Sequence, residues 1–251
     1  MNLFNLEGKV AVITGATRGL GAAMGEALAG YGADIVSIQR SSADKQTKVT
    51  VEKLGRRCEI IECDLADMQA VRQVMNRVDE LFEHVDILVN NAGIQRRSPA
   101  VDFSETDWDS VMDVNLKSVF LLCQQAGIRM LSRGYGKIIN IASLLSFQGG
   151  ITVPAYAAAK GGIVQLTKAL ANEWAGRGIN INAIAPGYMN TDMNEALIRN
   201  EMRSRQILER IPAGRWGDPH DMMGAAVFLA SSASDYVNGH VLVVDGGWMG
   251  R

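Results

Sequence analysis

The chain has 251 residues, a formal net charge of −2, 47% apolar residues and 21% charged residues. Its length suits one large α/β domain or two small ones, and its composition is that of a folded globular protein rather than a disordered one. Acidic and basic residues are interspersed, which argues against a nucleic-acid-binding surface and against a membrane-seeking face. No apolar run approaches the ~20 residues that span a bilayer, and the first residues lack the features of a signal peptide.

Cysteine and histidine usage points away from disulfides and metals. Cys58, Cys63 and Cys123 lack C-x-x-C spacing, and we predict reduced, mostly buried thiols in a cytoplasmic protein. The histidines are scattered, and none belongs to an H-E-x-x-H pattern. We therefore expect no metal site, and neither nucleic acid nor membrane as a partner.

Short β-branched segments alternate with segments of helical period along the whole chain. The segments predicted to be strands are 9–14, 34–39, 59–63, 86–90, 137–142, 180–185 and 240–245. They are nearly continuous in apolar residues, as strands of a parallel sheet covered on both faces are. Helical period is clearest in 67–83 and 156–176. The sequence therefore predicts one α/β domain over 1–251, with a doubly wound, seven-stranded parallel sheet and helices on both faces.

The longest stretch without a predicted strand runs from 191 to 239. We expect it to be helical. Its first part, about 190–216, is predicted to cover the site as a lid.

The first predicted strand ends in the glycine-rich segment TGATRGLG, which contains Gly15, Gly19 and Gly21. Glycines allow a tight turn and a close approach of the backbone to a ligand, and the start of the following helix offers free N–H groups to a pyrophosphate. The spacing is G-x-x-x-G-x-G rather than the usual G-x-G-x-x-G. A tight turn without a ligand is the alternative, but its place after the first strand of a doubly wound sheet favours a cofactor.

A serine, a tyrosine and a lysine stand together in the segment after the fifth predicted strand. Ser143 lies just beyond that strand, Pro154 suits a first helical turn, and Tyr156 and Lys160 are four residues apart on one helix face. Hydride transfer to a carbonyl needs a proton donor. An ammonium ~4 Å from a phenol, helped by an oxidised nicotinamide, could bring the pKa of the phenol into a useful range. We predict that Tyr156 is the acid–base group, assisted by Lys160, and that Ser143 holds the substrate oxygen. The alternative is an alanine-rich helix with both side chains on its surface.

Taken in order, TGATRGLG, NNAG (90–93), Asn115 in VNLKSVF, Ser143, YAAAK and PGYMNT (186–191) resemble the short-chain dehydrogenase/reductase family over nearly the whole chain. The resemblance implies a Rossmann-type oxidoreductase with a catalytic tetrad of Asn115, Ser143, Tyr156 and Lys160. Asn115 would hold a water that links Lys160 to solvent. By its residue type alone, Asn115 could equally be a helix-interior asparagine bonded to backbone.

The resemblance also implies a site for NAD(P)(H). Its predicted residues are Gly15, Thr17, Arg18, Gly19, Leu20, Gly21, Gln39, Arg40, Asp64, Leu65, Asn91, Ala92, Gly93, Tyr156, Lys160, Pro186, Gly187 and Thr191. Asp64 would contact the adenine, Asn90 and Gly93 would line the adenosine side, and Ile184 would flank the nicotinamide. Without the resemblance, Asp64 is more typical of a helix N-cap.

The end of the second predicted strand bears on the cofactor phosphate. Dehydrogenases that prefer NAD usually end this strand with an acid, but here Gln39 stands there, followed by Arg40 and two serines. Together with Arg18, Arg40 could clamp a 2′-phosphate, which predicts a weak preference for NADP(H) over NAD(H). In the alternative, both arginines are solvated and Gln39 hydrogen-bonds a ribose that carries no 2′-phosphate.

Further segments are similar to the sugar-acid dehydrogenases of this family, which act in the breakdown of pectin- and alginate-derived uronates. They include GIQRRSPAVDF, IPAGRWG and the C-terminal VVDGGW. A carboxylate and several hydroxyls call for a cation and polar donors, and the predicted substrate residues are Arg96, Arg97, Ser143, Gln148 and Tyr156. The arginine pair could instead be solvated or lie at a subunit contact.

Other functions remain open from the sequence. A gluconate-type dehydrogenase, another short-chain carbonyl reductase or, more remotely, an inactive dinucleotide-binding scaffold is possible. The family also implies a homotetramer that pairs helices at about 105–133 and 154–176.

Overall fold

The sheet is fully parallel and has the strand order β3-β2-β1-β4-β5-β6-β7. The computed structural model describes residues 2–251. Its strands are β1 (Val10–Thr14), β2 (Asp34–Gln39), β3 (Cys58–Glu62), β4 (Ile87–Asn90), β5 (Gly136–Ile141), β6 (Ile179–Pro186) and β7 (Val241–Val244). All seven predicted strands are confirmed, with ends within one residue of the prediction, and so is the doubly wound fold.

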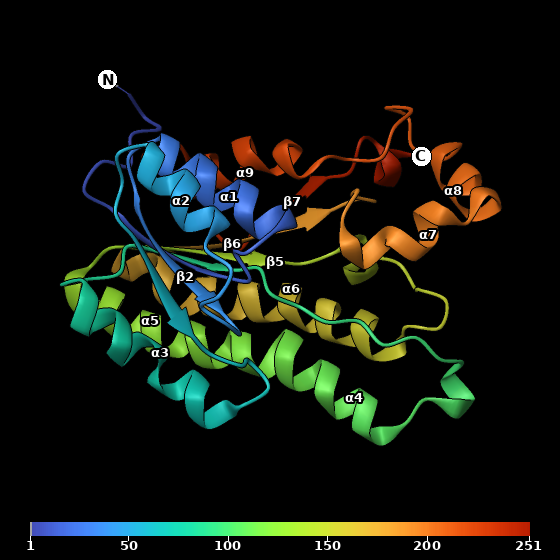
Figure 1. Ribbon diagram of the computed structural model, residues 1–251. Helices are drawn as coiled ribbons and strands as arrows, with labels where there is room; N and C mark the ends of the chain where they lie inside the picture. Colours follow the sequence, from blue (N-terminus) through green and yellow to red (C-terminus); the bar gives the residue numbers. More distant parts are fainter. Residues whose placement is uncertain (1) are drawn as a thin grey trace.

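Helices cover both faces of this sheet (Figure 1). One face of the sheet packs against α1 and α9, and the other face packs against α3, α5 and α6. The helices are α1 (Gly19–Gly30), α2 (Gln46–Lys53), α3 (Met68–Leu81), α4 (Glu105–Met112), α5 (Ser118–Arg133), α6 (Pro154–Trp174), α7 (Glu195–Arg199), α8 (Glu201–Leu208) and α9 (Met223–Ala230).

Alternation along each strand explains the two layers. Val12 of β1 and Leu88 of β4 pack into the core on the α3/α5/α6 side, whereas Ile13 and Val89, one residue further on, pack on the α1/α9 side. All four side chains are fully buried. Because successive side chains of a strand point to opposite faces, a strand covered on both sides must be apolar at nearly every position.

The two helices with the clearest predicted period are α3 and α6. Asp67 caps α3, since its carboxylate accepts from the backbone N–H groups of Gln69 and Ala70. The N-cap reading of Asp64 is therefore wrong. Pro154 occupies the first turn of α6, as expected from its fixed φ angle.

The segment predicted as one helix at about 105–133 is interrupted. A short π-helix, Asp113–Lys117, joins α4 to α5 and contains Asn115. Such wide turns are often found at functional sites. Nothing in the apolar period of the segment distinguishes this turn from an ordinary helix.

Residues 190–216, which we call the lid segment, contain a 3₁₀ turn (Asp192–Asn194) followed by α7 and α8. In Figure 1 these helices stand apart from the two main layers, at one end of the sheet. The segment's two ends meet, because Asn190 N donates to Gly217 O at 2.7 Å and Gly217 N donates to Tyr188 O at 2.9 Å. The lid segment thus begins and ends at one fixed point.

The cysteines Cys58, Cys63 and Cys123 are free and buried, and burial raises the pKa of each thiol. Within residues 2–251, no helix is both long and apolar enough to cross a membrane. The same part of the chain holds no group of three or more side chains arranged to bind a metal ion.

Candidate active site

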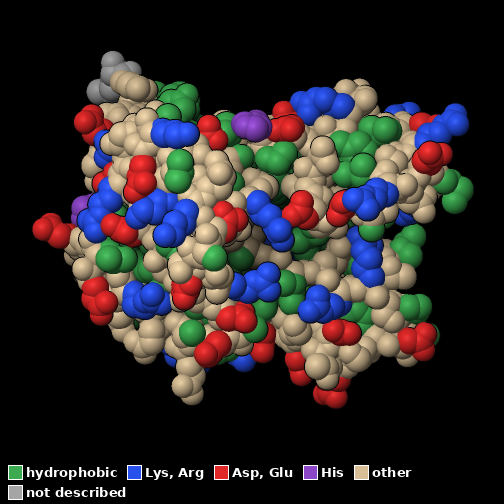
Figure 2. Space-filling model, viewed as in Figure 1, with side chains coloured by type: hydrophobic (Ala, Val, Ile, Leu, Met, Phe, Trp, Pro, Cys, Tyr) green, Lys and Arg blue, Asp and Glu red, His purple; other side chains and the backbone are tan. Residues whose placement is uncertain are grey.

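A cavity of about 1610 Å³ runs along the carboxyl ends of the central strands. It lies beside β1 and β4, where the strand order reverses and where open α/β sheets bind their ligands. Figure 2 shows a hollow on this face with basic side chains around its rim. The predicted cofactor residues line the cavity, except Gly21, Asn90 and Ile184, and so does every predicted catalytic or substrate residue except Asn115.

Gly21 lies beneath the glycine turn and supports it. A Cβ at Gly21 would stand 2.2 Å from Gly15 O and 2.5 Å from Asn91 Nδ2, so only glycine fits. Asn91 Nδ2 donates to Thr14 O at 3.0 Å and to Gly15 O at 3.1 Å. Gly15 and Gly19 have φ angles of 68° and 55°, which favour glycine. The turn is thus built for close backbone packing.

The start of α1 is open to an anion. Its N-cap residue, Arg18, makes no side-chain capping bond, and the first turn holds no acidic residue. The free N–H groups and the helix dipole therefore favour a phosphate at this position. The residues present fit a dinucleotide, which the size of the cavity also permits.

The end of β2 differs from the expected phosphate clamp in two respects. The Gln39 amide faces inward: its Oε1 accepts from Ser37, and its Nε2 donates to Ser41 O and Asp44 O. Gln39 therefore holds the turn after β2, and a bond from its amide to a ribose is not favoured. Arg18 pairs with Asp192 of the lid segment at 3.0 Å, so it would have to leave that partner to bind a phosphate.

Arg40 is available to a ligand. It is exposed, lines the cavity and forms no hydrogen bond or ion pair with any other residue in 2–251. Asp64, expected on the adenine, also lines this end, and its carboxylate accepts from Ala66 N at 2.9 Å.

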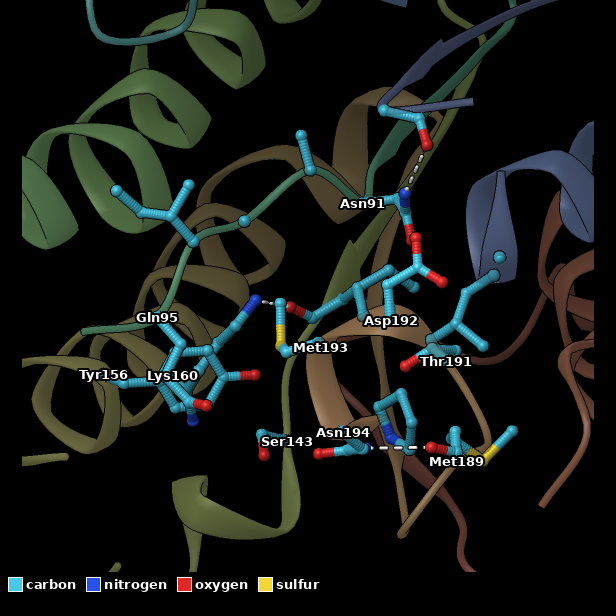
Figure 3. A pocket seen from close by; sticks show the side chains of 18 of the residues that line it. Asn91, Gln95, Ser143, Tyr156, Lys160, Met189, Thr191, Asp192, Met193 and Asn194 are labelled. Carbon is cyan, nitrogen blue, oxygen red and sulfur yellow. Dashed lines mark hydrogen bonds between the residues drawn. The ribbon is translucent and has the colours of Figure 1, made fainter. Parts of the chain in front are cut away.

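Ser143, Tyr156 and Lys160 lie together on one wall of the cavity, as Figure 3 shows. Ser143 lies close enough to Tyr156 to lower the pKa of the phenol. Lys160 Nζ donates to Ile141 O at 2.6 Å and lies 5.7 Å from the centre of the Tyr156 ring. The sequence prediction that these side chains share a site agrees with this geometry.

Lys160 is not among the groups that shift the pKa of the Tyr156 phenol, and its predicted effect together with an oxidised nicotinamide stays a prediction. Burial raises the pKa of Tyr156 above its usual value, against the opposing effects of the nearby Ser143 hydroxyl and the Arg97 charge. Burial also lowers the pKa of Lys160 to about 8. The Lys160 ammonium is directed to a backbone carbonyl rather than to the phenol oxygen. Tyr156 and Lys160 both lose hydration, which disfavours the charged form of each.

Asn115 is fully buried and joins two segments of the site. Its Nδ2 donates to Ile94 O at 2.8 Å, and its Oδ1 accepts from Ile94 N at 2.8 Å. A Cβ at Gly93 would stand 3.2 Å from Asn115 Oδ1 and 3.9 Å from Lys160 Nζ, so Gly93 lies between the two side chains. Asn115 thus bonds to backbone, as in the alternative interpretation of this residue. The backbone it contacts belongs to the loop after β4 and not to its own helix.

Two predicted cofactor neighbours are in the core instead. Asn90 is 2% exposed and Ile184 is fully buried, and neither lines the cavity. Asn90 Nδ2 donates to Asn140 Oδ1 at 2.9 Å, which joins β4 to β5, while its own Oδ1 is buried without a partner. Because side chains alternate along the backbone, the following residue, Asn91, reaches the cavity.

Ser146 is a site residue that the sequence reading missed. Its Oγ donates to Lys160 O at 2.7 Å and accepts from Ser143 N at 3.2 Å. Together with Ser143 it forms a capping box around a 3₁₀ turn. The S-x-x-S spacing was the signal that could have revealed it.

The substrate end of the cavity separates the two predicted arginines. Arg96 pairs with Asp107 at 3.3 Å, whereas Arg97 lies close enough to Tyr156 for its charge to affect the phenol. Gln148 Oε1 accepts from Trp248 Nε1 at 3.0 Å. The Arg210 guanidinium lies over the Trp248 ring, 3.9 Å from the ring centre. Neither Trp248 nor Arg210 was singled out from the sequence, although VVDGGW ends at Trp248 and IPAGRWG follows Arg210 directly.

Known proteins similar to this chain match it over nearly its whole length. A family model described as enoyl-(acyl carrier protein) reductase matches residues 15–249. The 2-dehydro-3-deoxy-D-gluconate 5-dehydrogenase of Escherichia coli K12 is 53% identical over 252 aligned positions, covering 100% of this chain and 99% of its own.

Solved structures agree with this result. A protein provisionally named 2-deoxy-D-gluconate 3-dehydrogenase, from Agrobacterium tumefaciens with bound NADP, is 52% identical with a TM-score of 0.94, over 100% of both chains. A gluconate 5-dehydrogenase of Burkholderia cenocepacia, in complex with NADP and tartrate, is 42% identical with a TM-score of 0.95 and covers 100% of this chain and 98% of its own. With the glycine turn and the Ser143–Tyr156–Lys160 group in one cavity, these matches establish that the chain belongs to the short-chain dehydrogenase/reductase family.

Proposed function

We propose that the protein is an NAD(P)-dependent sugar-acid dehydrogenase of uronate catabolism, with 2-dehydro-3-deoxy-D-gluconate as its substrate and carbon 5 as the reacting carbon. The observation that carries the proposal is the Ser143–Tyr156–Lys160 group on the wall of a cavity that begins at the glycine turn. The full-length identity of 53% to an enzyme of that name supports this choice of substrate.

Each residue of the group has a role in proton transfer. Tyr156 donates the proton to the oxygen of the carbonyl in reduction and accepts it in oxidation. Ser143 holds the same oxygen beside the phenol. Lys160, whose Nζ lies 5.7 Å from the centre of the Tyr156 ring, would supply the positive charge that a phenolate needs. When bound, the nicotinamide supplies or accepts the hydride.

Asn115 and the lid segment complete the arrangement. Asn115 fixes the loop at Gly93 and Ile94 beside Lys160, and a relay water there would link Lys160 to solvent. The lid segment closes over the substrate and excludes bulk water from the reaction. Asn194 and other lid residues already line the cavity in Figure 3.

The cofactor site would hold either dinucleotide, with NADP(H) weakly preferred. Residues 15–21 and the start of α1 would take the pyrophosphate, and Pro186, Gly187 and Thr191 would border the nicotinamide. Arg40 is the charge that would favour a 2′-phosphate. The NADP found with the Agrobacterium and Burkholderia proteins supports this assignment.

The assembly we propose is a cytoplasmic homotetramer. Phe120 and Ile128 on α5 are 40% and 63% exposed, which leaves apolar surface on a helix of the predicted interface. Burial of such residues against a second copy is favourable.

The test is a panel of keto acids with either reduced cofactor, followed by absorbance at 340 nm. A panel that holds the 2,5-diketo-3-deoxy acid, 5-keto-gluconate and a neutral ketose separates the candidate functions. Preference for the deoxy acid supports the proposal, and preference for 5-keto-gluconate favours the alternative that the Burkholderia relative suggests. No oxidation of reduced cofactor with any of them would contradict both.

A further inference from the structure

Four arginines line the substrate end of the cavity: Arg96, Arg97, Arg203 and Arg210. A sugar acid carries a carboxylate, so one or more of these side chains is the natural partner for it. Arg96 is already paired with Asp107, and Arg203 donates to Gln206 Oε1 at 3.3 Å. Arg97 and Arg210 form no ion pair with any acid in residues 2–251.

Arg97 is poorly suited to the carboxylate because of what it does for Tyr156. Its charge is one of the influences that lower the pKa of the phenol. A carboxylate bound to Arg97 would cancel that influence and bring a negative charge close to a developing phenolate. In a substrate that reacts at carbon 5, moreover, the carboxylate at carbon 1 lies toward the other end of the molecule.

Arg210 has the better geometry. Its guanidinium lies over Trp248, which is 4% exposed and is held by Gln148 and by the Tyr188 ring, 4.7 Å away. Stacking on an aromatic face fixes the guanidinium plane and leaves its N–H groups free at the edge. A carboxylate can accept two parallel hydrogen bonds from that edge.

We propose that Arg210, held flat by Trp248, binds the carboxylate of the substrate, in place of the predicted Arg96–Arg97 pair. Gln148, whose Oε1 is engaged by Trp248, keeps its Nε2 for a substrate hydroxyl. Arg210 follows α8 directly, so the bound carboxylate holds the end of the lid segment against the body. This assignment rests on the proposed sugar-acid activity.

The test compares Arg210→Ala with Arg210→Lys and with a matched control, Arg205→Ala. Arg205 lies on α8, which precedes Arg210, but it stands outside the cavity and pairs with Glu209. Each variant is assayed with the keto acid and with its primary amide, which has the same shape without the charge. In Arg210→Ala the KM for the acid rises about tenfold or more, and kcat changes by less than about threefold. The KM for the amide and the KM for the cofactor stay unchanged.

Arg210→Lys raises the KM for the acid less than Arg210→Ala does, because lysine keeps the positive charge. The recovery is incomplete, because lysine lacks the planar guanidinium. Arg205→Ala behaves as the wild type. An unchanged KM for the acid in Arg210→Ala, with an active wild type, overturns the Arg210 assignment and leaves the proposed function intact. An equal rise in KM for acid and amide also overturns it. A wild type without activity on any sugar acid overturns both.

Discussion

The hydroxyl of Ser146 joins the two segments that carry the catalytic group. It donates to Lys160 O in α6 and accepts from Ser143 N at the end of β5, so one side chain fixes the distance between Ser143 and the helix of Tyr156. Proton transfer depends on such positioning, because hydrogen-bond geometry must be met before the pKa matters. Ser146 is therefore a positioning residue.

Ser146→Ala is expected to lower kcat about tenfold and to leave the KM for the cofactor nearly unchanged, because the substrate oxygen and the phenol lose their fixed separation. Steady-state kinetics at saturating cofactor measures this change. Ser132→Ala removes a hydroxyl-to-carbonyl bond of the same kind at a distant, exposed position and serves as the control. Equal kcat values for Ser146→Ala and the wild type would show that the bond is only structural.

Lys160→Met is expected to change how stability depends on pH. Burial lowers the pKa of Lys160 from 10.5 to about 8, so between these values the unfolded chain holds the proton more tightly than the folded protein does. The free energy of unfolding of the wild type should therefore rise with pH in this window, relative to Lys160→Met, by about 2 kcal/mol between pH 7 and 9.5. Below about pH 7 Lys160 is protonated in both the folded and the unfolded state, so its destabilising contribution to the free energy of unfolding no longer changes with pH.

Urea unfolding of both proteins at the two pH values gives this difference, in which the other titrating groups cancel. A parallel pH dependence for wild type and variant would mean that Lys160 keeps an ordinary pKa in the folded protein.

Arg40→Ala is expected to lower kcat/KM for NADPH about tenfold and to alter that for NADH by less than about twofold, because only the former has a 2′-phosphate. Arg72→Ala on the outer surface of α3 is the control. Both cofactors are compared on one substrate. If the wild type prefers NADH and the substitution changes nothing, there is no phosphate clamp at Arg40.

The assembly is measured by light scattering. Four subunits of 27.1 kDa give a predicted mass of about 108 kDa, in keeping with closed symmetric assembly. A single species of 27.1 kDa would refute the tetramer.

The sequence was most informative where local pattern and tertiary structure coincide. The strands are apolar on both faces because both faces are covered, so their positions could be predicted to within one residue. Ser143, Tyr156 and Lys160 follow a strand end and begin a helix, and both features are local. Their side chains could therefore be assigned to one site before the fold was known.

Other features depend on contacts between distant segments. Whether Asn90 or Asn91 faces the cavity is set by the orientation of β4 in the sheet, and the pairing of Arg96 with Asp107 arises only when the loop folds back on α4. The π-helix that contains Asn115 has the same residue types as an ordinary α-helix. Arg210 and Trp248 become neighbours only through the docking of the C-terminal turn on the lid segment.

The central claim is that Tyr156 is the acid–base group of a sugar-acid dehydrogenase, and Tyr156→Phe tests it most directly. The measurement is kcat at 340 nm with the preferred keto acid, together with the dissociation constant of the reduced cofactor from its fluorescence. Removing the hydroxyl should lower kcat at least about a hundredfold, the usual scale for a positioned acid–base group, while the dissociation constant stays within about twofold. Near-normal kcat in Tyr156→Phe, with the cofactor bound as tightly as in the wild type, would contradict the account.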